Sequence, residues 1–348
     1  MSNLIGLAGI AVILGIAFAF SSNRKAINLR IVAAAFVLQV LVAVFVLYTG
    51  WGSTAIDKMS TGVLAVIGFS GDGIEFVFGG LANTDNIGFS FVVNVLPIII
   101  FFSALMSVLY HLRIMEWIVR LVGGFLHRVI GTGAVESMNA AANIFVGQTE
   151  APLVVRPYLK GLTEAQMFTV MVSGLASIAG TVLAAYAMLG AEMKYLLAAA
   201  FMAAPGGLLM AKIVMPDDEV VSSGEREKFV MEKSEHKNVI LAAASGTTDG
   251  LRLAANIGAM LITFVALIAL FNGLVGLVSG WFGYDLTLQK MLGWVFAPVM
   301  YLLSIPWAEA QAAGALFGEK VILNEFIAFS HLIWSETTYM LVCLAALT

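Results

Sequence analysis

Long apolar stretches without charged residues dominate the pattern of hydrophobic and polar positions along this chain. Each exceeds or approaches the roughly 20 residues that a helix needs to cross about 30 Å of hydrocarbon. Because buried helices of soluble proteins do not account for so many such stretches, we expect a membrane-spanning segment at each. The predicted spans are Met1–Asn23, Ile31–Ile56, Ile87–Leu112, Ala165–Ala191, Tyr195–Ala211 and Leu253–Phe282.

Positive charges flank these spans unevenly and orient them. The first stretch is followed, not preceded, by the basic residues Arg24, Lys25 and Arg30. This indicates a retained span with the N-terminus outside rather than a signal peptide. Of the 18 lysines and arginines, those that then lie outside are Lys58, Lys194, Lys290 and Lys320. That distribution requires the segment between Arg128 and Lys160 to enter and leave on one face, which predicts a re-entrant hairpin.

Two short segments, 137–155 and 310–331, carry polar residues inside apolar surroundings. The polar tip of the first consists of Gln148, Thr149 and Glu150. The tip of the second contains Asn324 and Glu325. A charge inside the membrane costs about 2.5–3.5 kcal/mol on insertion scales, and two glycine-interrupted segments in corresponding halves are typical of transporters with a midplane site. The structural alternative is that the carboxylates cap helix ends or pair with Arg156 and Lys320.

The span after the first hairpin has small and polar residues at its centre, in 173–181. Close helix packing through small residues explains such a stretch. A helix unwound near Ser177 explains it equally well, and its freed carbonyl groups and hydroxyl would supply the oxygen ligands that hard cations prefer.

Composition supports the membrane class. The 348 residues are 60% hydrophobic and 11% charged, with a net charge of −4 and one cysteine. Soluble proteins carry about 25% charged residues, and the composition also excludes disordered, disulfide-rich and nucleic-acid-binding classes. The mixed charges of Asp217–Lys237 indicate a solvated loop. Ile114–Ile130 indicates an interfacial amphipathic helix inside, and Gly52–Leu81 a similar element outside.

Two motifs carry a resemblance to a known family. Ala142–Leu153 resembles the first hairpin of the concentrative nucleoside transporters, and Gly318–Phe329 resembles their second-hairpin signature, with Ile327 where valine is usual. The likeness extends from Met1 to about Glu336. It implies an all-α polytopic membrane protein, an inverted-repeat transporter with two re-entrant helical hairpins, discontinuous helices and interfacial helices. It further implies a homotrimer in the bacterial inner (plasma) membrane that imports nucleosides together with a coupling ion. The resemblance thus indicates a transporter and not an enzyme.

The resemblance also implies roles for individual residues. The implied substrate contacts are Gln148 and Thr149 at the nucleobase with Glu150 alongside through water, Val182 packed on the base, and Glu325 at the ribose hydroxyls. Asn324 is a further implied substrate-binding residue. The implied sodium ligands are the carbonyl groups of Asn143, Val146 and Ile178 and the hydroxyl of Ser177. Because these residue types are all present, Na⁺ is favoured over protons as the coupling ion.

Five regions are expected along the chain. Residues 1–112 form scaffold spans with an external interfacial element. Residues 113–214 form a transport region with the first re-entrant hairpin and a discontinuous helix at 165–191. A cytoplasmic loop (215–252) and a scaffold span (253–282) follow. Residues 283–348 hold a second interfacial element, the second hairpin and the start of an incomplete helix. We expect symport by movement of the transport region against a trimeric scaffold in the lipid bilayer.

The last residues depart from the family pattern. Ser335–Thr337 resembles the start of a further discontinuous helix, but 335–348 would form only about 21 Å of helix. Two alternatives follow: a truncated, transport-deficient member of the family, or a different ion-coupled carrier of small polar solutes. A zinc protease is disfavoured because the sequence lacks a His-Glu-x-x-His motif. A channel is disfavoured because polar groups concentrate at two tips instead of lining a pore.

Overall fold

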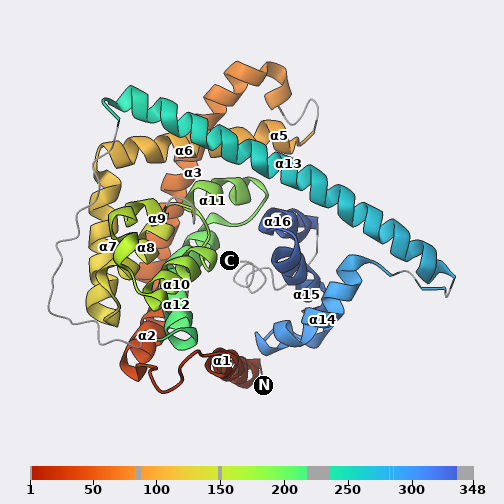
Figure 1. The fold of residues 1–348 in the computed structure, drawn as a ribbon. Coiled ribbons are helices and arrows are strands. Elements are labelled where there is room, and N and C mark those ends of the chain that lie inside the picture. Colours follow the sequence, from red (N-terminus) through yellow and green to blue (C-terminus); the bar gives the residue numbers. More distant parts are fainter. Residues whose placement is uncertain are drawn as a thin grey trace.

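The computed structural model describes residues 2–83, 88–147, 151–217, 236–281, 283–284 and 286–334. Within these ranges the chain forms helices, turns and loops and no strand, which confirms the all-α class. The helices are α1 (Ser2–Ala19), α2 (Leu29–Tyr48), α3 (Gly50–Phe78), η1 (Gly79–Ala82), α5 (Phe91–Asn94), α6 (Leu96–His111), α7 (Ile114–Ile130), α8 (Ala134–Asn143), α9 (Ala151–Val154), η2 (Arg156–Gly161), α10 (Glu164–Leu175), α11 (Gly180–Met188), α12 (Met193–Val214), α13 (Val239–Gly280), α14 (Leu288–Leu302), α15 (Trp307–Ile322) and α16 (Glu325–Trp334). Figure 1 shows α2 and α7–α12 on one side, α14–α16 on the other, and α13 passing both.

Several helices suit a membrane by length and composition. In the described part of the chain six segments qualify, and the pair α14 and α15, bent by 117°, brings the number up to seven. The six are Leu29–Tyr48, Gly50–Ala82, Phe91–His111, Glu164–Met188, Met193–Val214 and Val239–Gly280. The predicted first span corresponds to α1, an apolar helix of 18 residues. The protein is therefore a multi-pass membrane protein.

The predicted span Ile31–Ile56 is wrong at its C-terminal end, because Thr49 separates α2 from α3. Thr49 is extended, and its hydroxyl accepts a hydrogen bond from the amide of Gly52 at 3.0 Å. A side chain at position 52 would overlap the carbonyl oxygen of Phe45, so the helix junction requires glycine. The external element predicted at Gly52–Leu81 is mostly one long helix, which is itself long and apolar enough to cross a membrane.

The C-terminal boundary of the predicted loop 215–252 is also wrong, because α13 begins at Val239. The side chain of Asn238 caps this helix by accepting from the amide of Leu241 at 2.8 Å. Gly246 and Gly250 lie against α6, where an added Cβ would overlap α6 atoms. Small residues one turn apart let two helices approach closely, and Figure 1 shows α6 and α13 side by side. This packing extends the helix through polar residues that had indicated a loop.

Two other predicted helical segments are present. Helix α7 has the bounds expected for Ile114–Ile130. The helix expected at 165–191 is discontinuous, since α10 and α11 are separated by Ala176–Ala179. Of the two explanations for this stretch, the unwound helix is therefore the one that the backbone adopts.

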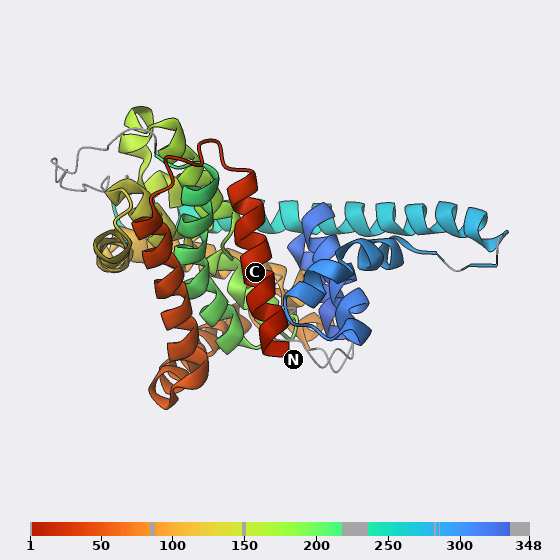
Figure 2. The same ribbon diagram turned by 90° about the horizontal axis from the view of Figure 1, so that it is seen from below.

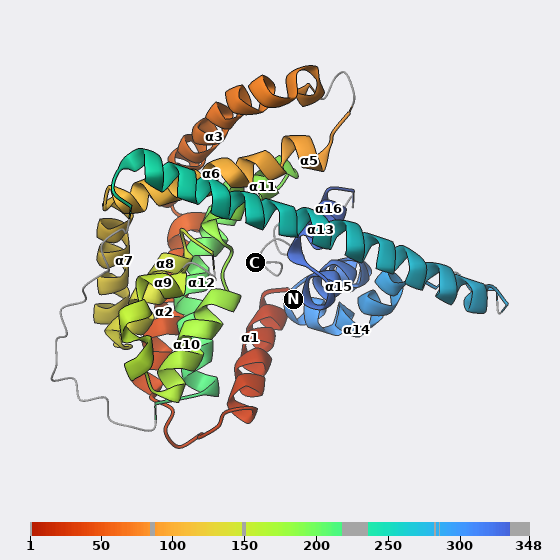
Figure 3. The ribbon, with the colours of Figure 1, turned by 45° about the horizontal axis from the view of Figure 1, so that its top comes forward.

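Two buried apolar clusters position the broken helices. One contains residues of α6, α11 and α16, such as Ile99, Leu183 and Phe326. The other contains residues of α2, α7 and α8, such as Val119 and Ala141. Helix α12 contributes to both, and Figures 2 and 3 show it running alongside α2. Helix α12 thus packs into the cluster that contains α8 and also into the cluster that contains α16.

Candidate functional site

The first polar segment is interrupted where the sequence predicted. Helix α8 ends at Asn143, the chain turns through 144–147, and α9 begins at Ala151. The predicted tip residues lie outside the described residues: Gln148, Thr149 and Glu150. Two predicted sodium ligands, Asn143 and Val146, are 1% and 2% exposed. Both therefore flank the tip from inside the protein.

A polar network fixes α8 against α10. The amide nitrogen of Asn139 donates to the hydroxyl of Ser173 at 2.8 Å and to the carbonyl of Val170 at 3.0 Å. The amide nitrogen of Asn143 donates to the carbonyl of Asn139 at 3.1 Å. Within the described part of the chain, the buried side-chain oxygens of Asn139, Asn143 and Thr181 have no hydrogen-bond partner. Such atoms commonly mark the place of a water or an ion, so this neighbourhood fits a cation.

The break in the next helix lies against the first one. Ser177 and Ile178 lie between α10 and α11, and the hydroxyl of Ser177 donates to the carbonyl of Gly174 at 3.2 Å. A Cβ added at Gly180 would overlap the carbonyl oxygen of Phe145, so glycine allows the two breaks to meet. Carbonyl groups released by two adjacent breaks, together with a hydroxyl, are the ligands that hard cations prefer. In the ranges described, no group of three or more His, Cys, Asp or Glu side chains offers a different metal site.

The second polar segment is interrupted between α15 and α16. The side-chain oxygen of Asn324 accepts from the amide of Phe326 at 2.6 Å and thereby caps α16. Glu325, the first residue of α16, accepts a hydrogen bond from the hydroxyl of Tyr186 at 3.2 Å. Among the described residues Glu325 forms no direct ion pair with Lys320, although the two charges interact electrostatically. Its place in the first turn of a helix does favour a carboxylate electrostatically.

Tyr186 is a contact that the sequence did not predict. Its side chain is 1% exposed, and its ring stacks on Phe329 with centroids 4.3 Å apart and lies 4.8 Å from Phe326. A buried tyrosine hydroxyl usually finds a partner, and Glu325 supplies one. Val182 lies one turn earlier on the same face of α11 and is 6% exposed. Helix α11 therefore meets the first break at its N-terminal end and Glu325 near its C-terminal end.

Another buried carboxylate, Glu319, belongs to the last turn of α15, before the break between α15 and α16, and is 1% exposed. It accepts from Gln289 at 3.0 Å and contacts the ring nitrogen of His331 at 2.9 Å. Gln289 in turn accepts from Asn272 of α13 at 3.1 Å. This chain of polar contacts joins α13, α14, α15 and α16. It holds the helix that starts with Glu325.

An ion-pair cluster holds the other end of α8. The ammonium of Lys212, 3% exposed, lies 2.6 Å from Glu136 and 2.7 Å from Asp217. The second carboxylate oxygen of Glu136 accepts from the amide of Gly133 at 2.8 Å. The cluster joins the start of α8 to the end of α12. The cluster was not predicted from the sequence, because Glu136 lies 76 residues from Lys212 along the chain.

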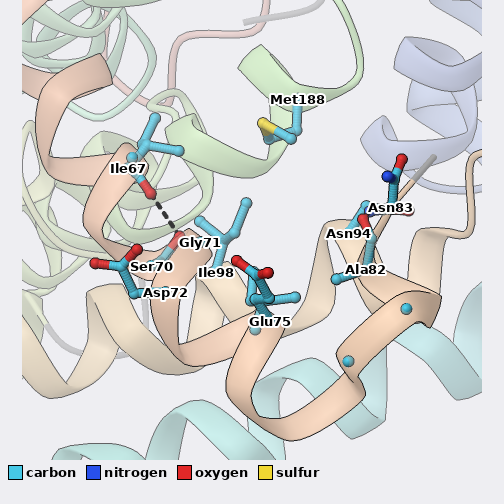
Figure 4. Close-up of a pocket in the computed structure, with 14 residues that line it drawn as sticks. Ile67, Ser70, Gly71, Asp72, Glu75, Ala82, Asn83, Asn94, Ile98 and Met188 are labelled. Carbon is cyan, nitrogen blue, oxygen red and sulfur yellow. Dashed lines mark hydrogen bonds between the residues drawn. The ribbon is translucent and has the colours of Figure 1, made fainter. Parts of the chain in front are cut away.

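A cleft of about 660 Å³ is lined by residues of α3, η1, α5, α6 and α11 (Figure 4). Asp72 and Glu75 of α3 lie on one side of it, and Asn94 and Met188 line it from α5 and α11. Of the predicted site residues that the structure describes, none lines this cleft. It therefore does not replace the site formed at the breaks.

Comparison with known proteins covers nearly the whole chain. Three family models match: Na⁺ dependent nucleoside transporter N-terminus at residues 8–81, Nucleoside recognition (Gate) at 92–193, and Na⁺ dependent nucleoside transporter C-terminus at 195–341.

Relatives and solved structures agree with these models. The chain is 46% identical to the nucleoside permease NupC of Helicobacter pylori over 338 residues, which are 95% of this chain and 80% of that protein. It is 50% identical to an uncharacterised transporter of Haemophilus influenzae, covering 94% and 79% of the two chains. The fold matches CNTnw in an inward-facing substrate-bound state with a TM-score of 0.92 and 45% identity, covering 99% of this chain and 85% of that one.

Proposed function

Since this chain belongs to the Na⁺-dependent, concentrative nucleoside transporter family, we propose that it imports nucleosides by sodium-coupled symport. The protein is a transporter and not an enzyme. The observation that carries the proposal is the contact of Tyr186 with Glu325, because it brings an embedded carboxylate to the helix that also meets the first break. A carboxylate in such a place suits a neutral solute with vicinal hydroxyls, since it accepts two hydrogen bonds.

In this proposal the nucleoside lies between the break that follows α8 and the break between α15 and α16. The residues that would contact the nucleobase are Gln148, Thr149 and, through water, Glu150. Val182 would pack on the base, and Glu325 would accept from the ribose hydroxyls with Asn324 beside it. The reasoning is chemical: a glutamine amide can form paired hydrogen bonds with the amide edge of a base. The burial of Val182 on the face of α11 that leads to Glu325 supports the arrangement.

The cation would be held where the first break meets the break before α11. Its ligands would be the carbonyl groups of Asn143, Val146 and Ile178 and the hydroxyl of Ser177. When bound, Na⁺ supplies the positive charge that holds these oxygens together. The buried, unpartnered side-chain oxygen of Asn143 supports a polar occupant there. Coupling then requires that the nucleoside and the cation each bind better in the presence of the other.

The transport step would move one part of the protein against another. Segments 137–155 and 310–331 would be the re-entrant hairpins, and residues 113–214 would move with them against a scaffold built from residues 1–112 and 253–282. The scaffold would form a homotrimer in the bacterial inner membrane, with the N-terminus outside. Family membership and the two interrupted segments support this scheme.

Calorimetry with uridine tests the proposal directly. We expect saturable binding of uridine to the purified chain, with a higher affinity in sodium chloride than in choline chloride of equal ionic strength. The reason is the reciprocal coupling of the two ligands. Absence of binding, or an affinity that is the same in both salts, would contradict sodium-coupled nucleoside transport.

Replacing Ser177 with alanine should raise the sodium concentration for half-maximal uridine binding by roughly 10- to 150-fold, since removing a polar group that contacts a charge costs about 1.5–3 kcal/mol. The measurement is a sodium titration of uridine binding. Ser70→Ala is the matched control, because the hydroxyl of Ser70 also bonds a carbonyl three residues earlier, at Ile67, but lies on α3. Identical sodium curves for the two variants would remove Ser177 from the cation site.

Replacing Tyr186 with phenylalanine should weaken uridine binding roughly two- to tenfold, the effect of one hydrogen bond. The ring stack on Phe329 remains, but the carboxylate of Glu325 loses the donor that orients it. Affinity is measured by calorimetry in sodium, beside Tyr48→Phe, which alters a tyrosine that is 83% exposed. Unchanged affinity for uridine would show that Tyr186 has no positioning role.

A further inference from the structure

A cleft of about 790 Å³ lies between α2, α3, α7 and α12. Its walls are largely apolar, with Val42, Phe45, Met59, Phe125 and Phe201 among the lining residues. Its volume falls within the range of about 300–1,000 Å³ that is usual for ligand sites. Phe45, Met59 and Phe125 are 50%, 41% and 54% exposed, so the cleft is open to an apolar ligand from the surroundings.

The one strongly polar part of the lining is positive. Arg120 and Arg128 of α7 both line the cleft. Arg120 lies 2.6 Å from Glu116, but its side chain remains 46% exposed. Arg128 is exposed and forms no ion pair with any of the residues that the structure describes. Among the described residues, the carboxylate of Glu116 pairs with one of the two guanidinium groups. The other guanidinium group leaves a positive charge beside the cleft for a ligand to neutralise.

We propose that this cleft binds an anionic glycerophospholipid. Its acyl chain would lie against the apolar walls from α2, α3 and α12, and its phosphate would contact Arg120 and Arg128. The planar guanidinium fork matches the oxygens of a phosphate, and basic pockets between membrane helices bind anionic lipid head groups. A soluble anion would not use the apolar walls, and a neutral lipid would not use the two arginines.

The lipid would also contact the first break. Ile144, the residue after Asn143, lines the cleft and is 5% exposed. The walls therefore come from the region expected to form the scaffold (α2 and α3) and from the region expected to move (α7, α12 and Ile144). An occupied cleft would influence the relative position of these regions. This consequence rests on the proposed function, whereas the binding of lipid does not.

Native mass spectrometry of the whole chain tests the binding. The protein in detergent is titrated with phosphatidylglycerol or with phosphatidylcholine that has the same acyl chains. We expect preferential binding of phosphatidylglycerol. Arg120→Gln/Arg128→Gln should weaken that binding roughly 30-fold, since each basic residue near an anionic lipid contributes roughly five- to sixfold to the affinity. The matched control is Arg30→Gln/Arg252→Gln, which removes two exposed arginines outside the cleft and should leave the preference intact.

Several outcomes would overturn the proposal. Equal affinity for the two lipids would exclude recognition of charge, and equal loss in the control variant would exclude these two arginines. Binding of glycerol phosphate as tightly as the lipid would indicate a soluble anion. In Phe125→Cys/Cys343→Ala the single cysteine of the chain lies at position 125, in the lining of the cleft. An intermolecular disulfide in this variant would therefore place the clefts of two copies against each other. Arg128→Gln alone changes one exposed side chain, so it provides the same test if the double variant does not fold.

Discussion

Replacing Lys212 with methionine is expected to lower the free energy of unfolding by about 3–5 kcal/mol, the usual cost of removing one partner from a buried ion pair. The ammonium lies 2.6 Å from Glu136 and 2.7 Å from Asp217. Without it, the carboxylate of Glu136, 1% exposed, would remain buried beside a second carboxylate. Because Glu136 belongs to the first turn of α8, the first broken segment should loosen. Thermal unfolding in detergent, followed by tryptophan fluorescence, measures the loss.

The same helix provides the control. Lys194, at the other end of α12, lies 2.8 Å from Glu192, but the two side chains are 42% and 54% exposed. Exposed ion pairs contribute about 0–1 kcal/mol, so Lys194→Met should unfold close to the wild type. The double variant Glu136→Gln/Lys212→Met removes one of the stranded charges and should recover part of the loss. A Lys212→Met protein as stable as Lys194→Met would mean that the buried cluster does not hold α8.

Much of the fold follows from the sequence because membrane helices are long, apolar and uninterrupted by charge. That signal located most of the long apolar helices, and the amphipathic pattern of 114–130 predicted the bounds of α7. It failed where contacts between helices decide the structure. Gly52 allows a sharp junction after α2 by lying against Phe45, and Gly246 and Gly250 extend α13 along α6. Neither effect is visible in the apolar pattern, because each depends on an atom in a neighbouring helix or turn.

The site divides in the same way. Asn143, Val146, Ser177 and Ile178 were predicted from motifs and from one irregular stretch, and the fold places the two breaks that contain them together. The partners that hold the site were not predictable. Tyr186 is 139 residues from Glu325 along the chain, so a single tyrosine in an apolar helix carries no sign of its partner. Motifs in the sequence thus identify candidate ligands. The residues that hold those ligands in place are brought to them only by the tertiary structure.

Replacing Glu325 with glutamine is expected to weaken uridine binding about 10- to 150-fold, which corresponds to the 1.5–3 kcal/mol of hydrogen bonds to a charged group. Glutamine has nearly the same shape and its carbonyl can still accept from Tyr186, so the packing of α16 should persist. What is lost is the second strong acceptor for vicinal hydroxyls. Calorimetry with uridine and with 2′,3′-dideoxyuridine separates the effects, because the dideoxy compound should bind both proteins with similar affinity.

Glu192→Gln serves as the control, since Glu192 is exposed and pairs with Lys194 at the start of α12. An equal loss for both nucleosides in Glu325→Gln would point to a disturbed helix rather than to a lost sugar contact. The double variant with Tyr186→Phe gives a further check. If the hydroxyl of Tyr186 acts by orienting the carboxylate of Glu325, its removal should cost less affinity once the carboxylate is gone, because residues in direct contact are not additive. Fully additive losses would show that the two side chains act on the nucleoside separately.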